Sequence, residues 1–319
     1  MKTYEKYFPF LIVLAAGFII FSFFAPAIFG DKHSIECMIP FIAIGAAILT
    51  FLAFLIQHQA NVQLSNDNKK QQLERQFYEM LKIHCDNVKL FHVESLHHSI
   101  MYDQSILKKC EGQEYFNCLL EEFDLIYSKI YESEGSEDAF NKAYRTFFFG
   151  IDAVTKKLTE ETINILRNFV VQNSNTLVWQ DHPKLIPLKD TLCKGRMDQL
   201  IPYYRRLFLT VKTVVQFNDD LFSYEDKRQL LRILRAQLSS AEQVLLYYNW
   251  KSGCGEQWEE DSSKPDGNHF FTDYRMVHNI IPRDCWTFSS DEIRDSLLEK
   301  NPNYKKIDDK DTLFEHIEE

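Results

Sequence analysis

The stretch "FPFLIVLAAGFIIFSFFAPAIF", residues 8–29, decides how the N-terminal part of this 319-residue chain folds. It holds no charged residue and is long enough to cross a hydrocarbon core of about 30 Å as a helix. A second uncharged run, "CMIPFIAIGAAILTFLAFLI" at residues 37–56, follows a short connector. The first run is too long for a signal peptide and lacks a small-x-small cleavage site. The sequence therefore predicts a transmembrane hairpin within residues 1–57.

Lysine and arginine residues near the two runs predict the orientation of the hairpin. Five of them flank its two ends: Lys2, Lys6, Lys69, Lys70 and Arg75. The connector has one lysine, Lys32, which two carboxylates offset. Because basic residues favour the cytoplasmic side, we expect both termini in the cytoplasm. The connector is too short to fold as a sensor, which argues against a receptor for external ligands.

Small residues rather than charges mark the two predicted spans. Neither span has an ionisable side chain, which argues against a selective transporter. Ala43 and Ala47 form a small-xxx-small face, and together with Gly17 and Gly45 they are the candidates for transmembrane helix packing. Two interpretations stay open: a simple anchor, or a bundle that self-associates and damages the bilayer.

Composition favours an all-α fold for the rest of the chain. Ten glycines and nine prolines are few for this length, and we find no alternation of Val, Ile and Thr that would predict a sheet. The net charge of −10 argues against a protein that coats nucleic acid. Seven scattered cysteines without a CxxC pair indicate reduced cytosolic thiols rather than disulfides or a zinc site.

The cytosolic region is expected to begin with a stalk and continue as a helical bundle. Residues 58–92 lack glycine and proline and gain an apolar stripe near their end, so we predict a stalk helix that becomes a core helix. Residues 93–319 are predicted to form the cytosolic helical domain. Thr159 is predicted to cap a helix because it comes directly before a helical run, and Pro202 must start or kink its helix.

One long helix is predicted over residues 223–249, opening with Ser223 and Asp226 as a capping box. Within it Arg235, Ser239 and Glu242 fall on one face beside a stripe of leucines. This line has three interpretations. It is a structural network that fixes the helix register, a ligand- or partner-binding face, or a catalytic site.

In the binding interpretation Arg235 faces an anion, and Arg205 or Arg206 assists. In the catalytic interpretation a nucleophile needs a base beside it, and we identify none. We therefore predict that the protein is not an enzyme.

Other motifs give weaker signals for cofactors. Gly195 and Arg196 resemble a flexible bend before a helix with an exposed arginine, which alone does not specify a phosphate site. The Walker and dinucleotide-binding glycine motifs are both missing from the sequence. The metal candidates are His92, His97 and His98. Glu94 and His98 would share a helical face, but no His-Glu-x-x-His motif or cysteine partner accompanies them, so we predict neither metal nor cofactor.

Three blocks of the chain occur in the order typical of one family: "GRMDQLIPYYRRLF" (195–208), "LRAQLSSAEQVLLYYN" (234–249) and "FTDYRMVHNII" (271–281). They resemble the putative phage abortive infection proteins (AbiC-like), bacterial proteins with two membrane spans ahead of a helical cytosolic region. "ERQFYEMLKIHCDNV" (74–88) is similar to that family's first cytosolic segment. The blocks contain our candidates for partner or ligand binding: Gly195, Arg196, Tyr203, Arg205, Arg206, Arg235, Gln237, Ser239, Glu242 and Asn249.

The resemblance implies a role in anti-phage defence at the bacterial inner membrane, where an infected cell dies or stops growing before the virus matures. The chain also resembles the two-span effectors of retrons, which a reverse transcriptase and its RNA–DNA product keep silent. We therefore predict a toxic effector that self-associates and disrupts the bilayer when such a partner releases it, without a small-molecule substrate. The alternatives are a membrane-tethered nuclease or nucleotide hydrolase using Arg235 and Glu242, and a scaffold that recruits another toxin.

Overall fold

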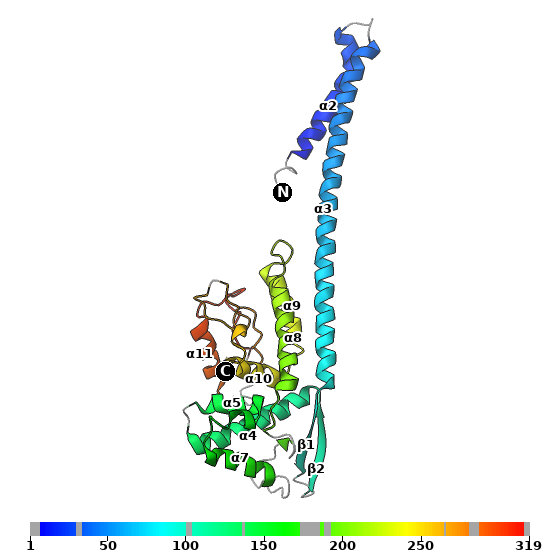
Figure 1. Ribbon diagram of the computed structural model, residues 1–319. Coiled ribbons are helices and arrows are strands. Elements are labelled where there is room, and N and C mark those ends of the chain that lie inside the picture. The colour runs from blue at the N-terminus through cyan, green and yellow to red at the C-terminus, as the bar shows by residue number, and fades with distance from the viewer. Residues whose placement is uncertain are drawn as a thin grey trace. The chain divides into compact units, whose positions relative to one another are not determined.

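A computed structural model of the protein describes residues 7–29, 34–99, 104–135, 138–172, 186–187, 193–264, 266–280 and 287–315. This part of the chain is mostly helical, as the sequence predicted (Figure 1). It divides into two compact units between Leu73 and Glu74. We describe each unit by itself.

The first unit contains α2 (Phe8–Phe29) and the part of α3 (Ser34–Leu90) that ends at Leu73. The two helices pack against each other along their apolar runs (Figure 1). By length and composition, the helix over Met38–Leu90 could cross a membrane, whereas the apolar run Phe8–Phe24 in α2 falls short of that length.

The second unit begins with the end of α3 and a small sheet that the sequence did not predict. β1 (His92–Ser99) pairs antiparallel with β2 (Gln104–Glu111), and the short β3 (Ile186–Pro187) pairs with the other edge of β1. Val93 and Cys110 lie opposite each other in the register, and both are buried. The fold is therefore mostly helical, as expected, with a small sheet at this point that pairing between its strands stabilises.

The other elements of the second unit are helical: α4 (Gln113–Glu134), α5 (Ala139–Phe149), α6 (Ile151–Val154), α7 (Glu160–Gln172), α8 (Met197–Val215), α9 (Tyr224–Arg235), α10 (Ser240–Lys251), the 3₁₀ helix η2 (Glu256–Trp258) and α11 (Ser290–Lys300). Helix α10 is the central one, because every residue from 241 to 250 is buried. A helix buried on all sides has no polar face to leave toward solvent. Its polar residues must therefore find partners inside the protein.

Aromatic side chains from α4, α5 and α10 fill the core of the second unit. The ring of Phe123 in α4 lies 4.7 Å from that of Tyr248 in α10 and 5.9 Å from that of Phe147 in α5, measured between centroids. Tilted and edge-to-face pairs of this kind each contribute about 0.5–1.5 kcal/mol beyond the burial of their surface. The rings thereby hold α4 and α5 against the central helix.

The local signals for helix starts give mixed results. The Thr159 hydroxyl accepts a hydrogen bond from the amide of Thr162, and Ser223 forms the predicted capping box with Asp226, so both predictions are confirmed. Helix α8 begins at Met197, so Pro202 lies inside the helix and does not start it. The single helix predicted over residues 223–249 is wrong, because the structure divides it into α9 and α10.

Candidate functional site

The corner between α9 and α10 contains the polar residues that the sequence singled out. Helix α9 ends at Arg235, Ala236 caps it, and α10 starts after Ser239. Ser239 and Glu242 form a capping box: the Ser239 amide donates to Glu242 Oε2 over 2.7 Å, and the Glu242 amide donates to Ser239 Oγ over 3.2 Å. These residues are therefore a helix start, not part of one continuous helical face with Arg235.

Glu242 also ties the corner to α8. Its Oε1 accepts a hydrogen bond of 2.9 Å from the hydroxyl of Tyr203, and both side chains are buried. Burial raises the pKa of Glu242, and the hydrogen bonds from Ser239 and Tyr203 oppose that shift. Both oxygens of the carboxylate are thus occupied in joining two helices, which fits the structural interpretation of this residue.

Arg235 has a different environment. Its side chain is buried, and Nη1 donates to the backbone oxygen of Arg275 over 2.9 Å. Among the described residues it forms no ion pair with a carboxylate. Burial, followed by the charges of Arg228 and Arg232, lowers its pKa to about 10. The guanidinium is still charged at neutral pH, so the corner holds a buried positive charge with a single carbonyl as its partner.

A groove of about 610 Å3 opens beside Arg235. One wall comes from α9 and the turn that follows it, with Arg228, Arg232 and Arg235. The other walls come from residues near 278 and from the C-terminal segment 307–315. The volume lies in the range of ligand pockets in proteins, about 300–1,000 Å3.

The C-terminal segment is fastened to α9 by an ion-pair cluster. Arg228 donates from both terminal nitrogens to the two oxygens of Asp311, at 3.1 and 3.0 Å. Arg275, which is fully buried, lies 3.0 Å from Asp311 as well. A bidentate pair with a second arginine behind it fixes a side chain closely. This cluster holds one wall of the groove in place.

His278 lies in the same groove and is neutral at physiological pH. Burial, followed by the charge of Arg235, lowers its pKa to about 4. Its Nδ1 lies 2.7 Å from the carbonyl oxygen of Leu313, and because a carbonyl only accepts, Nδ1 carries the proton. Nε2 is then the acceptor of the ring.

The structure places Gly195 and Arg196 differently from the sequence prediction. The side chain of Arg196 is buried, and its Nε and Nη2 atoms each lie 2.7 Å from Glu122 Oε2 in α4. Gly195 has φ +93°, and a Cβ there would lie 2.7 Å from the backbone of Phe149 and Gly150. The expectation of a flexible bend before an exposed arginine is therefore wrong, because tight backbone packing and a buried ion pair fix this segment.

The remaining sequence candidates also lie outside the groove. Asn249 donates to the hydroxyl of buried Tyr144 over 3.0 Å, and the backbone oxygen of exposed Gln237 accepts from Gln113 over 3.1 Å. Arg205 is exposed on α8, and Arg206 lies near His84 at the end of α3. The structure thus brings neither Arg205 nor Arg206 to the groove that Arg235 lines.

The sequence analysis missed Arg228, Arg232 and Lys310 as candidates. A signal for the first two was present, because they precede Arg235 by seven and three residues, a spacing that places all three on one side of a helix. Lys310 has no such signal, since the fold alone brings it to α9.

The candidate metal ligands within residues 92–98 do not lie on a helix. Residues 92–99 form strand β1, so Glu94 and His98 do not share a helical face. The side chains of Glu94, His97 and His98 lie outside the described part of the structure. Within the residues that the structure describes, no group of three or more His, Cys, Asp or Glu side chains could hold a metal ion.

The first unit contains the predicted packing residues Gly17, Ala43, Gly45 and Ala47. Gly45 lies in the contact between α2 and α3, where a Cβ would come within 2.7 Å of Ile19 and 3.2 Å of the backbone oxygen of Ala15. Ala43 and Ala47 are exposed, as is Gly17. The contact inside this chain therefore uses Gly45, and the small-xxx-small face remains open to another helix.

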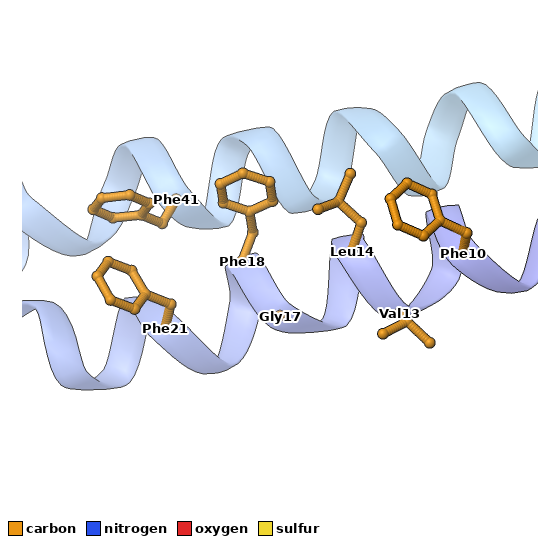
Figure 2. A pocket seen from close by; sticks show the side chains of 7 residues that line it. All are labelled: Phe10, Val13, Leu14, Gly17, Phe18, Phe21 and Phe41. Atoms are coloured by element: carbon orange, nitrogen blue, oxygen red, sulfur yellow. The ribbon is translucent and has the colours of Figure 1, made fainter.

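Gly17 lies in an apolar hollow of about 400 Å3 on α2 (Figure 2). Six apolar side chains line the hollow with it: Phe10, Val13, Leu14, Phe18, Phe21 and Phe41. Figure 2 shows Phe21 of α2 beside Phe41 of α3, and the centroids of the two rings lie 5.0 Å apart. A surface this apolar suits hydrocarbon better than water.

The chain thus combines an apolar pair of helices with a helical unit whose polar corner and groove are built by α8, α9, α10 and the C-terminal segment. Residues 195–285 match the family model of the putative phage abortive infection proteins. This match confirms the AbiC-like resemblance over the segment that it covers. The match includes the whole α9–α10 corner and does not extend to residues 74–88. No curated protein and no solved structure matches the chain.

Proposed function

We propose that this protein is a membrane-anchored effector of bacterial anti-phage defence, which kills or arrests the infected cell by disrupting the inner membrane. The family match over residues 195–285 supports the role in abortive infection. The observation that carries the membrane step is the apolar pair of helices in the first unit. The proposal also includes a partner that holds the effector silent, such as the reverse transcriptase and RNA–DNA product of a retron.

The exterior of α2 and α3 supports a location in the bilayer. Phe10, Val13 and Phe23 of α2 are 64%, 70% and 68% exposed, and Phe54 of α3 is 62% exposed. Soluble proteins rarely expose a continuous apolar surface of this kind. We propose that both helices span the membrane with both termini in the cytoplasm, as the flanking lysines favour.

Self-association is the step that would turn an anchor into a lesion. Ala43 and Ala47 on α3 are exposed and four residues apart in the small-xxx-small pattern, so a second helix could approach the backbone closely there. Release from the partner would let copies meet through this face and disturb the bilayer. This part of the proposal depends on the two spans.

The competing enzyme proposal would use Arg235 and Glu242 to cleave a nucleotide or nucleic acid. The environment of Glu242 does not favour it, because the carboxylate is buried and already accepts hydrogen bonds from Ser239 and Tyr203. A scaffold that recruits another toxin is a third proposal, and it predicts no toxicity when the neighbouring gene is absent.

The order of events in infected cells separates these proposals. Cells carrying the full-length protein are infected with phage, and membrane potential is followed with a dye while RNA, DNA and nucleotides are sampled. The effector proposal expects potential to fall before nucleic acids or nucleotides are lost. Loss of RNA, DNA or nucleotides while potential stays normal would overturn it in favour of the enzyme.

A further inference from the structure

We propose that the groove lined by Arg228, Arg232, Arg235 and Lys310 binds a phosphate monoester of nucleotide size. The inference deepens the proposed function, since it assigns a chemical class to the ligand through which the helical unit is controlled. The role of the ligand in controlling the effector rests on the proposed function. The binding itself does not, because it is measured on the protein directly.

The first argument is an imbalance of charge around the groove. Four cationic side chains and three carboxylates, Asp308, Asp311 and Glu315, line it. Asp311 is shared between Arg228 and a further arginine behind the wall, Arg275, so its charge is fully used. Among the described residues, and with Arg275 included, five cations stand against three carboxylates, and a bound anion would correct the difference.

The second argument is which cations remain without a carboxylate. Arg232 and Lys310 are exposed, and neither forms an ion pair with a described residue. Arg235 is 8% exposed, and among the described residues its guanidinium donates to the Arg275 carbonyl alone. A buried guanidinium without an anionic partner is costly unless a ligand or the fold compensates for it. Arg235 lines the groove, so a ligand can reach its guanidinium group.

The carboxylates of the groove are engaged with other groups. The backbone amide of Lys310 donates to Asp308 over 2.9 Å, and the Asn279 amide group donates to Glu315. Each of these two carboxylates therefore already has a hydrogen-bond partner within the protein. His278 is neutral, so it adds an acceptor and no charge.

Geometry and size favour a phosphate ester over a simple carboxylate. Guanidinium groups bind phosphate through paired N–H donors, and two arginines with a lysine can contact three oxygens of one group. The groove has about 610 Å3, more than a phosphate alone requires, and the apolar side chains of Leu238 and Ile307 line part of it. These would contact the organic part of the ligand.

Isothermal titration calorimetry on the full-length protein in detergent tests the proposal. The probes are AMP, a 5′-phosphorylated oligonucleotide and the same oligonucleotide with a 5′-hydroxyl. We expect AMP or the 5′-phosphorylated strand to bind and the 5′-hydroxyl strand to bind at least tenfold more weakly. Tight binding of AMP identifies a free nucleotide as the source of the phosphate, and preference for the phosphorylated strand identifies a nucleic-acid end.

Arg232→Gln is the test variant because its side chain is exposed and its loss should not affect folding. We expect it to weaken binding about tenfold, the size of one charge-assisted contact. Arg167→Gln on α7, which removes an exposed arginine paired with Asp152, is the matched control and should bind as the wild type does. Arg235→Lys keeps the charge but removes the paired donors, and it should also weaken binding.

Three results would overturn the inference: no binding of any phosphorylated probe, tight and equal binding of the 5′-phosphate and 5′-hydroxyl strands, or unchanged affinity in Arg232→Gln. Failure of the membrane proposal has a different signature. A protein that binds AMP through Arg232 but leaves membrane potential intact would retain this inference and lose the proposed toxicity.

Discussion

Tyr203 donates its hydroxyl hydrogen to Glu242 over 2.9 Å and so joins the middle of α8 to the first turn of α10. The same carboxylate accepts the Ser239 amide, so one side chain both starts the central helix and holds it to its neighbour. Ser239 and Glu242, in the block 234–249, therefore have a structural role that their spacing along the chain does not reveal.

Removing the Tyr203–Glu242 bond should destabilise the second unit measurably. Tyr203→Phe keeps the ring and loses the donor, and we expect a loss of about 1–2 kcal/mol in the free energy of unfolding. Glu242→Gln weakens the capping box too and should cost more, about 2–3 kcal/mol. Urea denaturation of the two single variants and the double variant gives the coupling. Additive losses would show that the two side chains act independently.

The buried pair of Arg196 and Glu122 should be sensitive to removal of one partner. Arg196→Met leaves the Glu122 carboxylate buried without its cation, and we expect a loss of about 3–5 kcal/mol in stability. The double variant Arg196→Met with Glu122→Leu removes both charges and should recover most of that loss. Urea denaturation measures both. A double variant no more stable than Arg196→Met would mean that the pair is not the source of the loss.

Stability should depend on pH through His84, which is buried against the ring of Tyr203 at the end of α3. Burial, followed by the charge of Arg206, lowers its pKa to about 4. Below pH 6.5 His84 is protonated in the unfolded chain but stays neutral in the folded protein. The free energy of unfolding therefore falls as the pH drops from 6.5 toward 4.

His84→Phe removes this proton uptake. Relative to wild type, the variant should gain about 2 kcal/mol between pH 7.5 and pH 5, since 1.5 pH units separate pH 5 from the unfolded pKa. Chemical denaturation at the two pH values measures the difference. Buried carboxyls such as Glu242 and Glu259 have raised pKa values and also make stability depend on pH. Their contributions are the same in both proteins, so they cancel when the two stabilities are subtracted. If the stability difference between the two proteins were the same at pH 7.5 and at pH 5, His84 would be accessible to protons in the folded state.

Packing between α2 and α3 should be required for toxicity if the membrane proposal is correct. Gly45→Leu places side-chain atoms where Ile19 and the Ala15 backbone lie, and should separate the two helices. Ala46→Leu places the same side chain at an exposed position and serves as the control. We expect loss of membrane depolarisation with the first and wild-type depolarisation with the second. Equal depolarisation by both variants at equal expression would contradict a role for this contact.

Much of the fold follows from patterns that are local in the sequence. Uncharged runs predict α2 and the start of α3, and serine followed three residues later by a carboxylate predicts the start of α9. The same spacing of Ser239 and Glu242 was interpreted as one face of a longer helix, because both interpretations place residues three apart. Only the backbone turn at residues 236–239 distinguishes them.

The small sheet and the groove were beyond sequence reasoning for another reason. Strands β1 and β2 have too little alternation to be recognised, and they are stabilised by pairing with each other. The groove needs Arg228 and Asp311 to meet across 83 positions of the chain, and Arg235 and Arg275 across 40. No local pattern contains such contacts. The three arginines of α9 were visible, but their partners were not.

The ion pairs to Asp311 have one consequence for comparing members of this family. They place residues 307–315, which lie after the matched segment 195–285, directly opposite the arginines inside it. The family match includes the arginines but not the wall opposite them, so the match alone does not define the shape of the groove. A substitution confined to residues 307–315 would alter that opposing wall and leave every arginine of α9 in place.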